Sequence, residues 1–261
     1  PSWFSTSVSL LPKKGDLKDL KNWRPISLIN ADAKVFTRLL NSRIIKCAQK
    51  LVTPYQAGFL RGRFIADNGL LMKLIMEHAR LTSSDSVGLL LDQEKAYDRV
   101  HPSYLCKVLH HFGFPPSIVQ SLSTLFFNTG LHINVNGFLS TPVLQHRGLR
   151  QGDPISPILF NLAFEPLLRR ILSDPHFSGF QLPKSVCSPP HIHSISSVKL
   201  LAYADDIVCF LKSPQDLTAL QHHIHLYSKA SNAKVNFNKT EAFALSGSRS
   251  CYHRIWRTPL L

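Results

Sequence analysis

Residues 198–211 read VKLLAYADDIVCFL, in which two apolar segments flank the tetrapeptide YADD. The segments 198–202 and 207–211 are short and apolar apart from Lys199, which is typical of strands that are covered on both faces. The few polar residues between them indicate a turn, so the stretch predicts a hairpin with Asp205 and Asp206 at its tip. Two carboxylates are therefore expected where two buried strands meet.

A second apolar run, Val87–Leu91, is followed directly by Asp92. It also predicts a strand that is covered on both faces. Asn136-Gly137 marks a tight hairpin between two further short strands. Apolar residues recur at helical spacing elsewhere, and helices are expected over 32–50, 102–111, 115–128, 156–172 and from 213 onward. Strands and helices are therefore expected to be mixed along the chain.

Two further helical patterns concern surfaces. The helix after the loop 58–63 is expected to place one group of side chains together on one side: Leu70, Leu71, Leu74, Ile75 and His78. Five histidines raise the question of a metal site, but no cysteine or acid completes a set of ligands around them. We therefore interpret them as solvated; they are His191, His193, His222, His223 and His225.

The composition excludes several classes of protein. Apolar residues make up 44% of the 261 positions, which is enough for a core and argues against disorder. Asn161 and Glu165 interrupt the longest apolar run, so no segment reaches the roughly 18 residues that a membrane span needs. The 5 cysteines are scattered and form no CxxC pair, which favours a reducing, intracellular compartment. Because the chain begins at Pro1 without a signal sequence, we expect an interior part of a longer protein.

The positive charge is concentrated near the N-terminus. The chain has a formal net charge of +14, and residues 1–80 contain 14 Lys and Arg against 5 Asp and Glu. Such a basic region predicts a polyanionic partner, because neutralised phosphates release counterions and strengthen binding. An anionic membrane surface is the alternative, but no helix is both strongly basic and lined with Trp or Phe. A basic surface can also serve solubility alone, so the charge by itself leaves a nucleic-acid partner open, while no membrane partner is expected.

The acids at the strand ends need a compensating charge. Burying a carboxylate costs several kcal/mol unless a partner offsets the loss of hydration. Asp92, Asp205 and Asp206 supply hard oxygen ligands, which favour Mg²⁺ or Mn²⁺. Two such ions can activate an attacking oxygen and stabilise a leaving pyrophosphate. An Asp-Asp pair is also ordinary in a turn, so the pair alone does not decide the question.

Three motifs, in the right order, resemble those of one enzyme family. YADD at 203–206 resembles the YxDD hairpin of reverse transcriptases, LDQEKAYDRV at 91–100 resembles their first catalytic motif, and RGLRQGDPISP at 147–157 resembles the motif between these two. The flanking segments LPKK at 11–14, NWRPISL at 22–28 and QAGF at 56–59 match as well. The chain is identified as a member of the reverse transcriptase family of non-LTR, LINE-like retrotransposons over about residues 8–245.

The resemblance implies an α+β fold, the fingers and palm of a right-hand polymerase, with an antiparallel palm sheet backed by helices and with the thumb largely absent. Residues 1–86 would be the fingers and 87–245 the palm, with 113–150 partly returning to the fingers. Residues 246–261 would be a tail or the start of a truncated thumb. The missing thumb and an endonuclease are expected in a longer parent protein.

The activity implied by the resemblance is that of an RNA-directed DNA polymerase. Its partners would be an RNA template, a DNA primer and dNTPs, and the primer 3′-hydroxyl would attack the α-phosphate of a dNTP. Asp92 and Asp205 would hold two Mg²⁺ ions, with Mn²⁺ as the substitute and the backbone carbonyl of Gln93 as a further ligand. Asp206 is assigned to the same catalytic and metal-binding set. Lys239 matches a lysine that protonates pyrophosphate.

The resemblance also assigns residues that bind nucleotide and nucleic acid. Tyr97 matches an aromatic side chain that strikes a ribose 2′-hydroxyl and so selects deoxynucleotides; the alternative is a core aromatic. Gln151 and Gly152 would pack against the incoming nucleotide and template base, where the missing Cβ of glycine permits a close approach. The other nucleotide contacts are assigned to Lys13, Lys14, Arg24 and Gln93, the two lysines being otherwise a solvated loop. Template and primer contacts are assigned to Arg61, Arg63, Arg147, Arg150 and Tyr203.

Two alternatives remain open. One is a catalytically inactive, nucleic-acid-binding relic of a retrotransposon. The other keeps the chemistry but changes the family, to a group II intron maturase or a telomerase-like enzyme. The strings WRPISL at 23–28 and KAYDRV at 95–100 favour the retrotransposon.

Overall fold

The computed structural model describes residues 3, 5–182 and 197–248, and the contacts within it divide the chain into two compact units. Unit 1 consists of residues 1–51 and 95–163, and unit 2 consists of residues 52–94 and 164–261. Helix α6 (Ser156–Ser173) is continuous and contributes to both units. His191, His193 and residues 249–261, for which the sequence carries expectations, lie outside the described residues.

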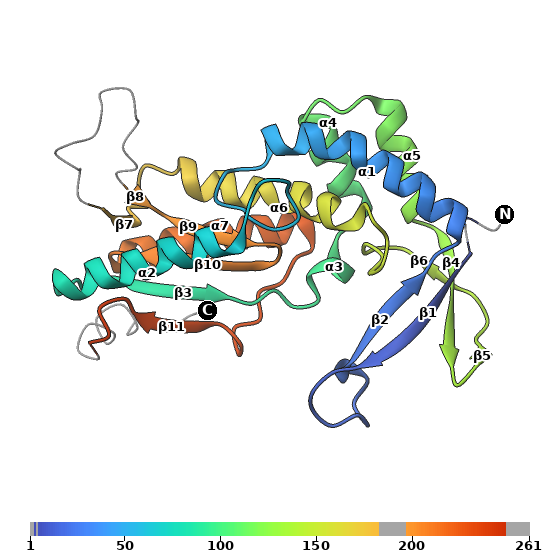
Figure 1. Cartoon of the computed structure of the whole chain (residues 1–261), viewed down its shortest axis with the longest axis horizontal. Coiled ribbons are helices and arrows are strands. Elements are labelled where there is room, and N and C mark those ends of the chain that lie inside the picture. The colour runs from blue at the N-terminus through green and yellow to red at the C-terminus, as the bar shows by residue number, and fades with distance from the viewer. Residues whose placement is uncertain (1–2, 4, 183–196, 249–261) are drawn as a thin grey trace. The chain divides into compact units, whose positions relative to one another are not determined.

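Unit 1 is built on a mixed sheet in the order β2-β1-β4-β5, which can be followed in Figure 1. Strand β1 (Ser5–Pro12) pairs antiparallel with β2 (Trp23–Leu28) and parallel with β4 (Thr129–Val135). The predicted turn at Asn136-Gly137 connects β4 to β5 (Phe138–Leu139), and β6 (Val143–Gln145) pairs with the other end of β4. Its helices are α1 (Ala31–Leu51), α3 (Ala96–Arg99), α4 (Pro102–His111), α5 (Pro116–Phe126) and the first half of α6.

Prolines begin several helices. Pro102 and Pro116 occupy the first turns of α4 and α5, where the missing N–H has no intrahelical partner to lose and the fixed φ suits the helix. The apolar stripes of the two helices, which include Leu109 and Phe126, are buried where α4 contacts α5. These helices agree with those predicted from the periodicity.

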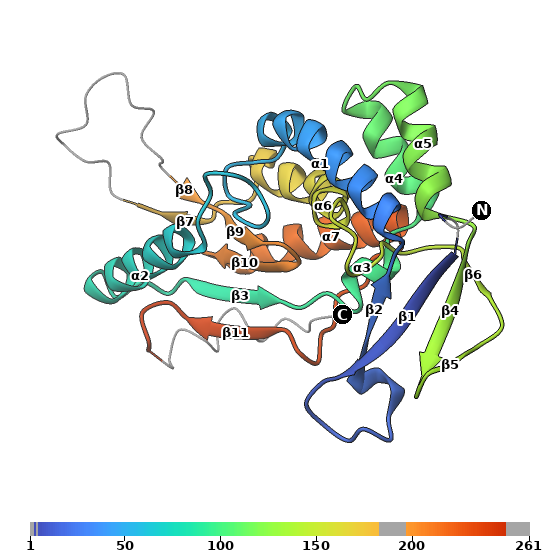
Figure 2. The ribbon, with the colours of Figure 1, turned by 45° about the vertical axis from the view of Figure 1, so that its right-hand side comes forward.

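Unit 2 is built on an antiparallel sheet in the order β11-β3-β10-β9 (Figure 2). The strands are β3 (Val87–Leu91), β9 (Leu200–Tyr203), β10 (Asp206–Leu211) and β11 (Glu241–Ala244), and β7 (Phe180–Gln181) forms a separate short pair with β8 (Ser197–Val198). The helices are α2 (Ile65–Leu81), the second half of α6, and α7 (Pro214–Ser231). The predicted hairpin around YADD and the predicted strand before Asp92 are both present.

Both faces of the unit 2 sheet are covered over β3 and β10, which explains the apolar runs Val87–Leu91 and Ile207–Leu211. Helix α2 lies along the sheet in both views (Figures 1 and 2), and its Ile75 and Ala79 pack into a cluster with Leu201 and Phe210. The alternate residue Cys209 is fully buried and points to the opposite face, because successive side chains of a strand alternate. Helix α7 contacts the same strand, β10.

The face that α2 buries agrees with the predicted one only in part: Ile75 and Leu71 pack into the core as predicted, and other members of the set do not. Leu70 and Leu74 are 61% and 55% exposed, whereas Ile75 and Ala79 are fully buried. Apolar residues occupy most of the circumference of α2, so their spacing did not identify the side that faces the sheet. The small residue Ala79 was not included in the prediction. The buried side of α2 is thus narrower than the part of its surface that carries apolar residues.

The compact units are defined by contacts within the chain, and the division into fingers and palm stays a prediction. Residues 52–86 belong with the strands of unit 2, because α2 packs on that sheet, and residues 95–163 belong with unit 1. The α+β class is confirmed by the antiparallel sheet and its covering helices. Among the described residues, no helix is long and apolar enough to cross a membrane.

Candidate active site

The three predicted acids lie at one edge of the unit 2 sheet. Leu91 of β3 faces Ile207 of β10 in the antiparallel ladder. The next position along the ladder is therefore occupied by Asp92, which follows Leu91, and by Asp206, which precedes Ile207. Asp206 in turn pairs with Tyr203 of β9, which leaves Ala204 and Asp205 as the turn between them. The strand register therefore brings together acids that are more than a hundred positions apart in the sequence.

The electrostatics of this edge favour a bound cation. Burial raises the pKa of Asp206, and the negative charge of Asp92 raises it further, so the two carboxylates are close enough to repel each other. Among the described residues, no group of three or more His, Cys, Asp or Glu side chains is arranged to hold a metal ion by itself. Mg²⁺ is commonly held by one or two carboxylates together with substrate phosphates and water. The donor set fits a cation that binds with substrate rather than a closed protein cage.

The backbone that follows Asp92 is held by the segment 234–240. Asn236 donates its N–H to the Asp92 carbonyl at 2.8 Å, and the Glu94 N–H donates to the Lys234 carbonyl at the same distance. The Lys234 ammonium also pairs with the Glu94 carboxylate at 3.2 Å. Lys239 lies in the turn after Asn236, where its N–H donates to the Asn236 carbonyl and its side chain is exposed. An exposed amine is thus carried by the loop that fixes Asp92.

Gln93 connects the two acidic motifs through its side chain. Its Nε2 donates to the Asp205 carbonyl at 3.3 Å. The sequence assigns Gln93 a backbone carbonyl contact to metal, and the side-chain contact to the turn was not anticipated. A side-chain amide at this position therefore ties β3 to the YADD turn.

Tyr203, the first residue of the YADD motif, is exposed next to Phe59. The ring centroids are 6.3 Å apart with an interplanar angle of 33°, and Tyr203 and Phe59 are 37% and 47% exposed. Two exposed aromatic rings offer a surface on which a base can stack. Phe59 has no assigned role in the sequence-based site, although the QAGF segment that contains it helped to identify the family.

In unit 1, the predicted triphosphate contacts lie at the loop end of one hairpin. Arg24 of β2 faces Leu11 of β1, and the Lys13 N–H donates to the Asn22 carbonyl at 2.7 Å where the two strands meet the loop. The side chains of Lys13, Lys14 and Arg24 are all exposed. The hairpin thus presents three cations to solvent, as a phosphate-binding surface requires.

Gln151 and Gly152 pack on the same hairpin. The Ser27 N–H donates to the Gln151 carbonyl at 2.7 Å. Gly152 has a φ of +114°, and a Cβ at this position would lie 2.7 Å from the Ser27 carbonyl oxygen, so only glycine fits. The side chain of Gln151 bonds to Asp98, whose pKa is raised by burial and lowered in part by Lys95, Lys13 and this bond.

Tyr97 is held by stacking. Its ring is parallel to that of Phe160, with centroids 4.8 Å apart and an angle of 10° between the planes. The Leu149 N–H donates to the Tyr97 carbonyl at 2.8 Å, which connects the first catalytic motif to the RGLRQGDP segment. The ring is half-buried, so it is anchored on one side in the core of unit 1.

Arg150 has a structural role, which corrects the predicted contact with template or primer. Its side chain is buried, and its guanidinium donates to the Leu125 carbonyl at 2.8 Å and to the Thr129 hydroxyl at 2.7 Å. It also donates to Gln145 Oε1 at 3.2 Å and lies over the Phe126 ring. These partners occupy the guanidinium, because a buried arginine must satisfy its donors inside the fold.

Arg63 also differs from its prediction. Its guanidinium donates to the carbonyls of Val52, Thr53 and Gln56, with distances of 2.8 Å to Val52 and 2.7 Å to Gln56. These bonds close the loop between α1 and α2, and the guanidinium of Arg63 is half-buried. Arg61 and Arg147, in contrast, are exposed, and their contact with nucleic acid stays a prediction.

His223 is a further correction, since the sequence predicts a solvated histidine. It is 5% exposed, and its Nε2 lies 2.7 Å from Asp174 Oδ2, while the Arg170 Nε–H donates to Nδ1 at 3.0 Å. Because Arg170 can only donate, Nδ1 accepts and the proton lies on Nε2 toward Asp174. The three residues tie α7 to α6 and the loop after it.

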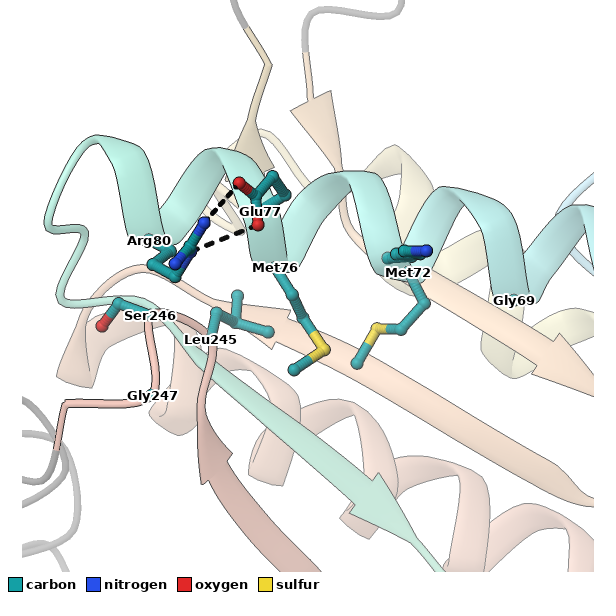
Figure 3. A pocket seen from close by; sticks show the side chains of 9 residues that line it. Gly69, Met72, Met76, Glu77, Arg80, Leu245, Ser246 and Gly247 are labelled. Atoms are coloured by element: carbon teal, nitrogen blue, oxygen red, sulfur yellow. Dashed lines mark hydrogen bonds and ion pairs between the residues drawn. The ribbon is translucent and has the colours of Figure 1, made fainter.

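A groove of about 420 Å³ lies between α2 and the end of β11. Figure 3 shows Met72 and Met76 of α2 beside Leu245, with an ion pair between Arg80 and Glu77 at the rim. None of the residues assigned to catalysis or to nucleotide binding lines this groove. The groove is therefore separate from the acidic edge of the sheet.

The sequence profile of the family "Reverse transcriptase (RNA-dependent DNA polymerase)" matches residues 11–258. The chain is 36% identical over 92% of its length to the "Transposon TX1 uncharacterized 149 kDa protein" of Xenopus laevis, of which it covers 18%. It is 27% identical over 89% of its length to the "Retrovirus-related Pol polyprotein from type-1 retrotransposable element R2" of Popillia japonica, of which it covers 31%. The chain thus spans a third or less of these relatives.

Solved structures agree on the fold. The chain superposes with a TM-score of 0.63 on telomerase from Candida albicans, solved in complex with a fragment of telomeric RNA, over 91% of this chain and 41% of that one. The sequence identity is only 12%, so this likeness concerns the fold. The retrotransposon relatives, not the telomerases, share the sequence. The chain therefore belongs to the reverse transcriptase (RNA-dependent DNA polymerase) family, in the branch of non-LTR, LINE-like retrotransposons.

Proposed function

We propose that the chain is the polymerase part of a retrotransposon protein, which extends a DNA primer with dNTPs on an RNA template. The observation that carries this proposal is the juxtaposition of Asp92 with Asp206 at one edge of the β3–β10 ladder, beside the turn that contains Asp205. Repulsion between the two carboxylates has no benefit for folding. It is the arrangement expected where a cation completes the site.

Divalent cations are general in this family, and we propose that this chain binds two Mg²⁺ ions, for which Mn²⁺ can substitute. Asp92 and Asp205 would hold both, with the Gln93 backbone carbonyl as a further ligand and Asp206 as a supporting carboxylate. When bound, the pair would lower the pKa of the primer hydroxyl and neutralise charge on the phosphates. The substrate phosphates would supply the remaining ligands, which fits the finding that no closed protein cage is formed by the residues that the structure describes.

The residues of unit 1 would bind and select the nucleotide. Arg24 is suited to a bidentate phosphate contact, with Lys13 and Lys14 as additional cations. Gln151 and Gly152 would pack against the base and sugar, since the glycine leaves room for a close approach. Tyr97, stacked on Phe160, would exclude a ribose 2′-hydroxyl by steric contact.

In the reaction, the primer 3′-hydroxyl would give its proton to solvent water and its oxygen would bond to the α-phosphorus, while the bond between the α-phosphorus and the oxygen that bridges it to the β-phosphate breaks. The pyrophosphate leaves with the electron pair of that bond. Lys239 would donate a proton to it as a general acid, a role that suits its exposed position on the loop that fixes Asp92. Arg61, Arg147 and Tyr203 would contact template and primer.

The test is extension of a labelled DNA primer annealed to an RNA template, with dNTPs and MgCl₂, by the purified chain. Products that lengthen one nucleotide at a time in the order set by the template are expected. Binding of the duplex without extension, under any divalent cation, would contradict the proposal and favour the inactive nucleic-acid-binding relic.

A further inference from the structure

Ala204, the residue that precedes Asp205, has a left-handed backbone with a φ of +54°. This conformation is unfavourable for a residue with a Cβ, and alanine has no polar side chain that could offset the strain. Ala204 is also buried. The turn that presents Asp205 and Asp206 must therefore be held in this conformation by its neighbours.

One side chain, that of Gln56, pairs both backbone groups of Ala204. The Ala204 N–H donates to Gln56 Oε1 at 2.8 Å, and Gln56 Nε2 donates to the Ala204 carbonyl at 2.9 Å. Gly58 also donates its N–H to Gln56 Oε1, at 2.9 Å. The two N–H donors fix the orientation of the amide, because a flipped amide would place its own NH₂ against them. Gln56 is fully buried, so water does not compete for these bonds.

The loop that carries Gln56 is itself anchored to β9. The Ala57 N–H donates to the Ala202 carbonyl at 2.9 Å, and the Ala202 N–H donates to the Tyr55 carbonyl at 2.9 Å. Gly58 approaches so closely that a Cβ there would lie 2.4 Å from the Ala204 nitrogen. Arg63 closes the loop from the other side through the Gln56 carbonyl. The loop is thus held in place by these bonds, and the side chain of Gln56 connects it to the turn.

We infer that Gln56 is a positioning residue for the polymerase reaction: its carboxamide keeps Ala204 left-handed and so sets the direction of Asp205 and Asp206. The inference rests on the function proposed above, in which these acids bind the catalytic cations. Gln56 touches neither substrate nor metal. It acts on the acids only through the backbone of the turn.

The first test compares wild type with Gln56→Ala. Loss of a side chain that orients metal-binding groups typically reduces metal affinity or activity about 10- to 100-fold. We expect a decrease of this size in kcat for primer extension and a higher Mg²⁺ concentration at half-maximal rate, with KM for dNTP little changed. Equal Mg²⁺ dependence and equal kcat would overturn the inference.

Asn68 provides a matched control. Its Nδ2 donates to the Ala202 carbonyl at 3.0 Å, so it bonds to the same strand two residues before the turn. That carbonyl keeps the Ala57 N–H as a partner when Asn68 is removed. Asn68→Ala should therefore leave kcat and the Mg²⁺ dependence near wild type. A decrease in kcat equal to that of Gln56→Ala would mean that both substitutions act by destabilising β9, and it would contradict the positioning role of Gln56.

Gln56→Glu gives a readout that a merely structural role would not produce. A protonated carboxyl has one O–H donor and one free acceptor, so it can make both bonds to Ala204, whereas the ionised form cannot donate to the Ala204 carbonyl. Activity relative to wild type should rise as the pH falls, because burial favours the protonated form. Asn68→Asp, with the same change of charge nearby, should show a constant ratio. A constant ratio for Gln56→Glu would contradict the inference, and this variant also serves if Gln56→Ala does not fold.

Hydrogen exchange of the metal-free protein separates this inference from the proposed function. The Ala204 amide should exchange faster in Gln56→Ala than in wild type or Asn68→Ala, because it loses its acceptor. Unchanged exchange would overturn the positioning role even if the protein is an active polymerase. Failure of the wild type to extend any primer would instead overturn the proposed function, and the exchange result would still decide whether Gln56 holds the turn.

Discussion

Asp92 and Asp206 continue the antiparallel ladder of β3 and β10 just beyond the paired residues Leu91 and Ile207, and the charge of Asp92 helps to raise the pKa of Asp206. The register is enforced by the apolar side chains of both strands, since a slip by one residue would turn them out of the core. The fold thus holds two like charges together. Their repulsion opposes folding at this point, which is the arrangement expected if this edge binds a cation as proposed.

The first prediction concerns that repulsion. Asp92→Asn should raise the melting temperature of the metal-free protein, because it removes the charge that opposes ionisation of Asp206. Calorimetry in EDTA measures the change. Asp67→Asn, which alters an exposed carboxylate in the first turn of α2, is the control and should have little effect. A lower melting temperature for Asp92→Asn would show that the carboxylates do not repel.

The second prediction concerns sugar selection by Tyr97. Tyr97→Ala should increase the incorporation of ribonucleotides relative to deoxynucleotides, because the ring stacked on Phe160 would no longer exclude the 2′-hydroxyl. Tyr97→Phe keeps the ring and should keep the discrimination. The measurement is the ratio of kcat/KM for dNTP and rNTP in single-nucleotide extension. If both variants retain the wild-type ratio, Tyr97 is only a core aromatic.

The third prediction concerns Arg150. Arg150→Ala should lower the free energy of unfolding by about 3 kcal/mol, because the Leu125 carbonyl and the polar side chains of Thr129 and Gln145 lose their buried donor. Denaturant titration measures this loss. A variant as stable as wild type would mean that the guanidinium is not needed in the core.

A fourth prediction concerns the exposed Arg147, which should behave in the opposite way. Arg147→Ala should leave the free energy of unfolding unchanged and weaken binding to nucleic acid of any sequence. The slope of log affinity against log salt concentration should decrease in magnitude by about 1, as expected for the loss of one phosphate contact. Fluorescence anisotropy at several salt concentrations measures the slope, and an unchanged slope would remove Arg147 from the binding surface.

The fifth prediction concerns Glu165, which is fully buried in α6. Burial raises the pKa of its carboxyl from 4.5 to about 7, in spite of bonds from the Thr53 N–H and Arg169. The second oxygen, Oε2, is buried without a hydrogen-bond partner in the described part of the chain, as expected if a proton resides there. The pKa of Glu165 is higher in the folded than in the unfolded protein. Its contribution to the free energy of unfolding is therefore fully present below pH 4.5 and is lost as the pH rises to about 7.

Glu165→Gln tests this by removing the titration. The free energy of unfolding of wild type should fall, relative to that of the variant, by on the order of 3 kcal/mol between the two pKa values. The difference between the two curves is measured, so that other titrating groups cancel. A difference that is constant with pH would show that Glu165 is ionised in the folded protein.

The sequence predicts those parts of the fold that have a local signature. The apolar runs before Asp92 and around YADD predicted the three strands that carry the acids, and the prolines and periodicity predicted α4, α5 and α7. The assignment of Arg63 and Arg150 to nucleic acid was wrong, because the sequence does not reveal whether an arginine faces solvent or bonds to groups inside the fold. His223 was missed for the same reason, since its partners Asp174 and Arg170 are distant in sequence.

Gln56 shows a different limit. The QAGF segment was singled out only as a flank of the family resemblance, and its spacing carries no chemical signal. Its role depends on a loop that meets the turn 148 residues later, so only the folded chain shows the contact. One signal was present: Ala204 occupies a turn position that favours glycine or asparagine, which indicates that something else must hold that turn.

Primer extension by wild type, Asp205→Asn and Asp67→Asn tests the central claim most directly. With an RNA template, a DNA primer, dNTPs and MgCl₂, wild type and Asp67→Asn should extend the primer at similar rates. Asp205→Asn should show no extension while it keeps its circular dichroism spectrum and its affinity for the duplex. Extension by Asp205→Asn at the wild-type rate would contradict the assignment of this edge of the sheet as the catalytic centre.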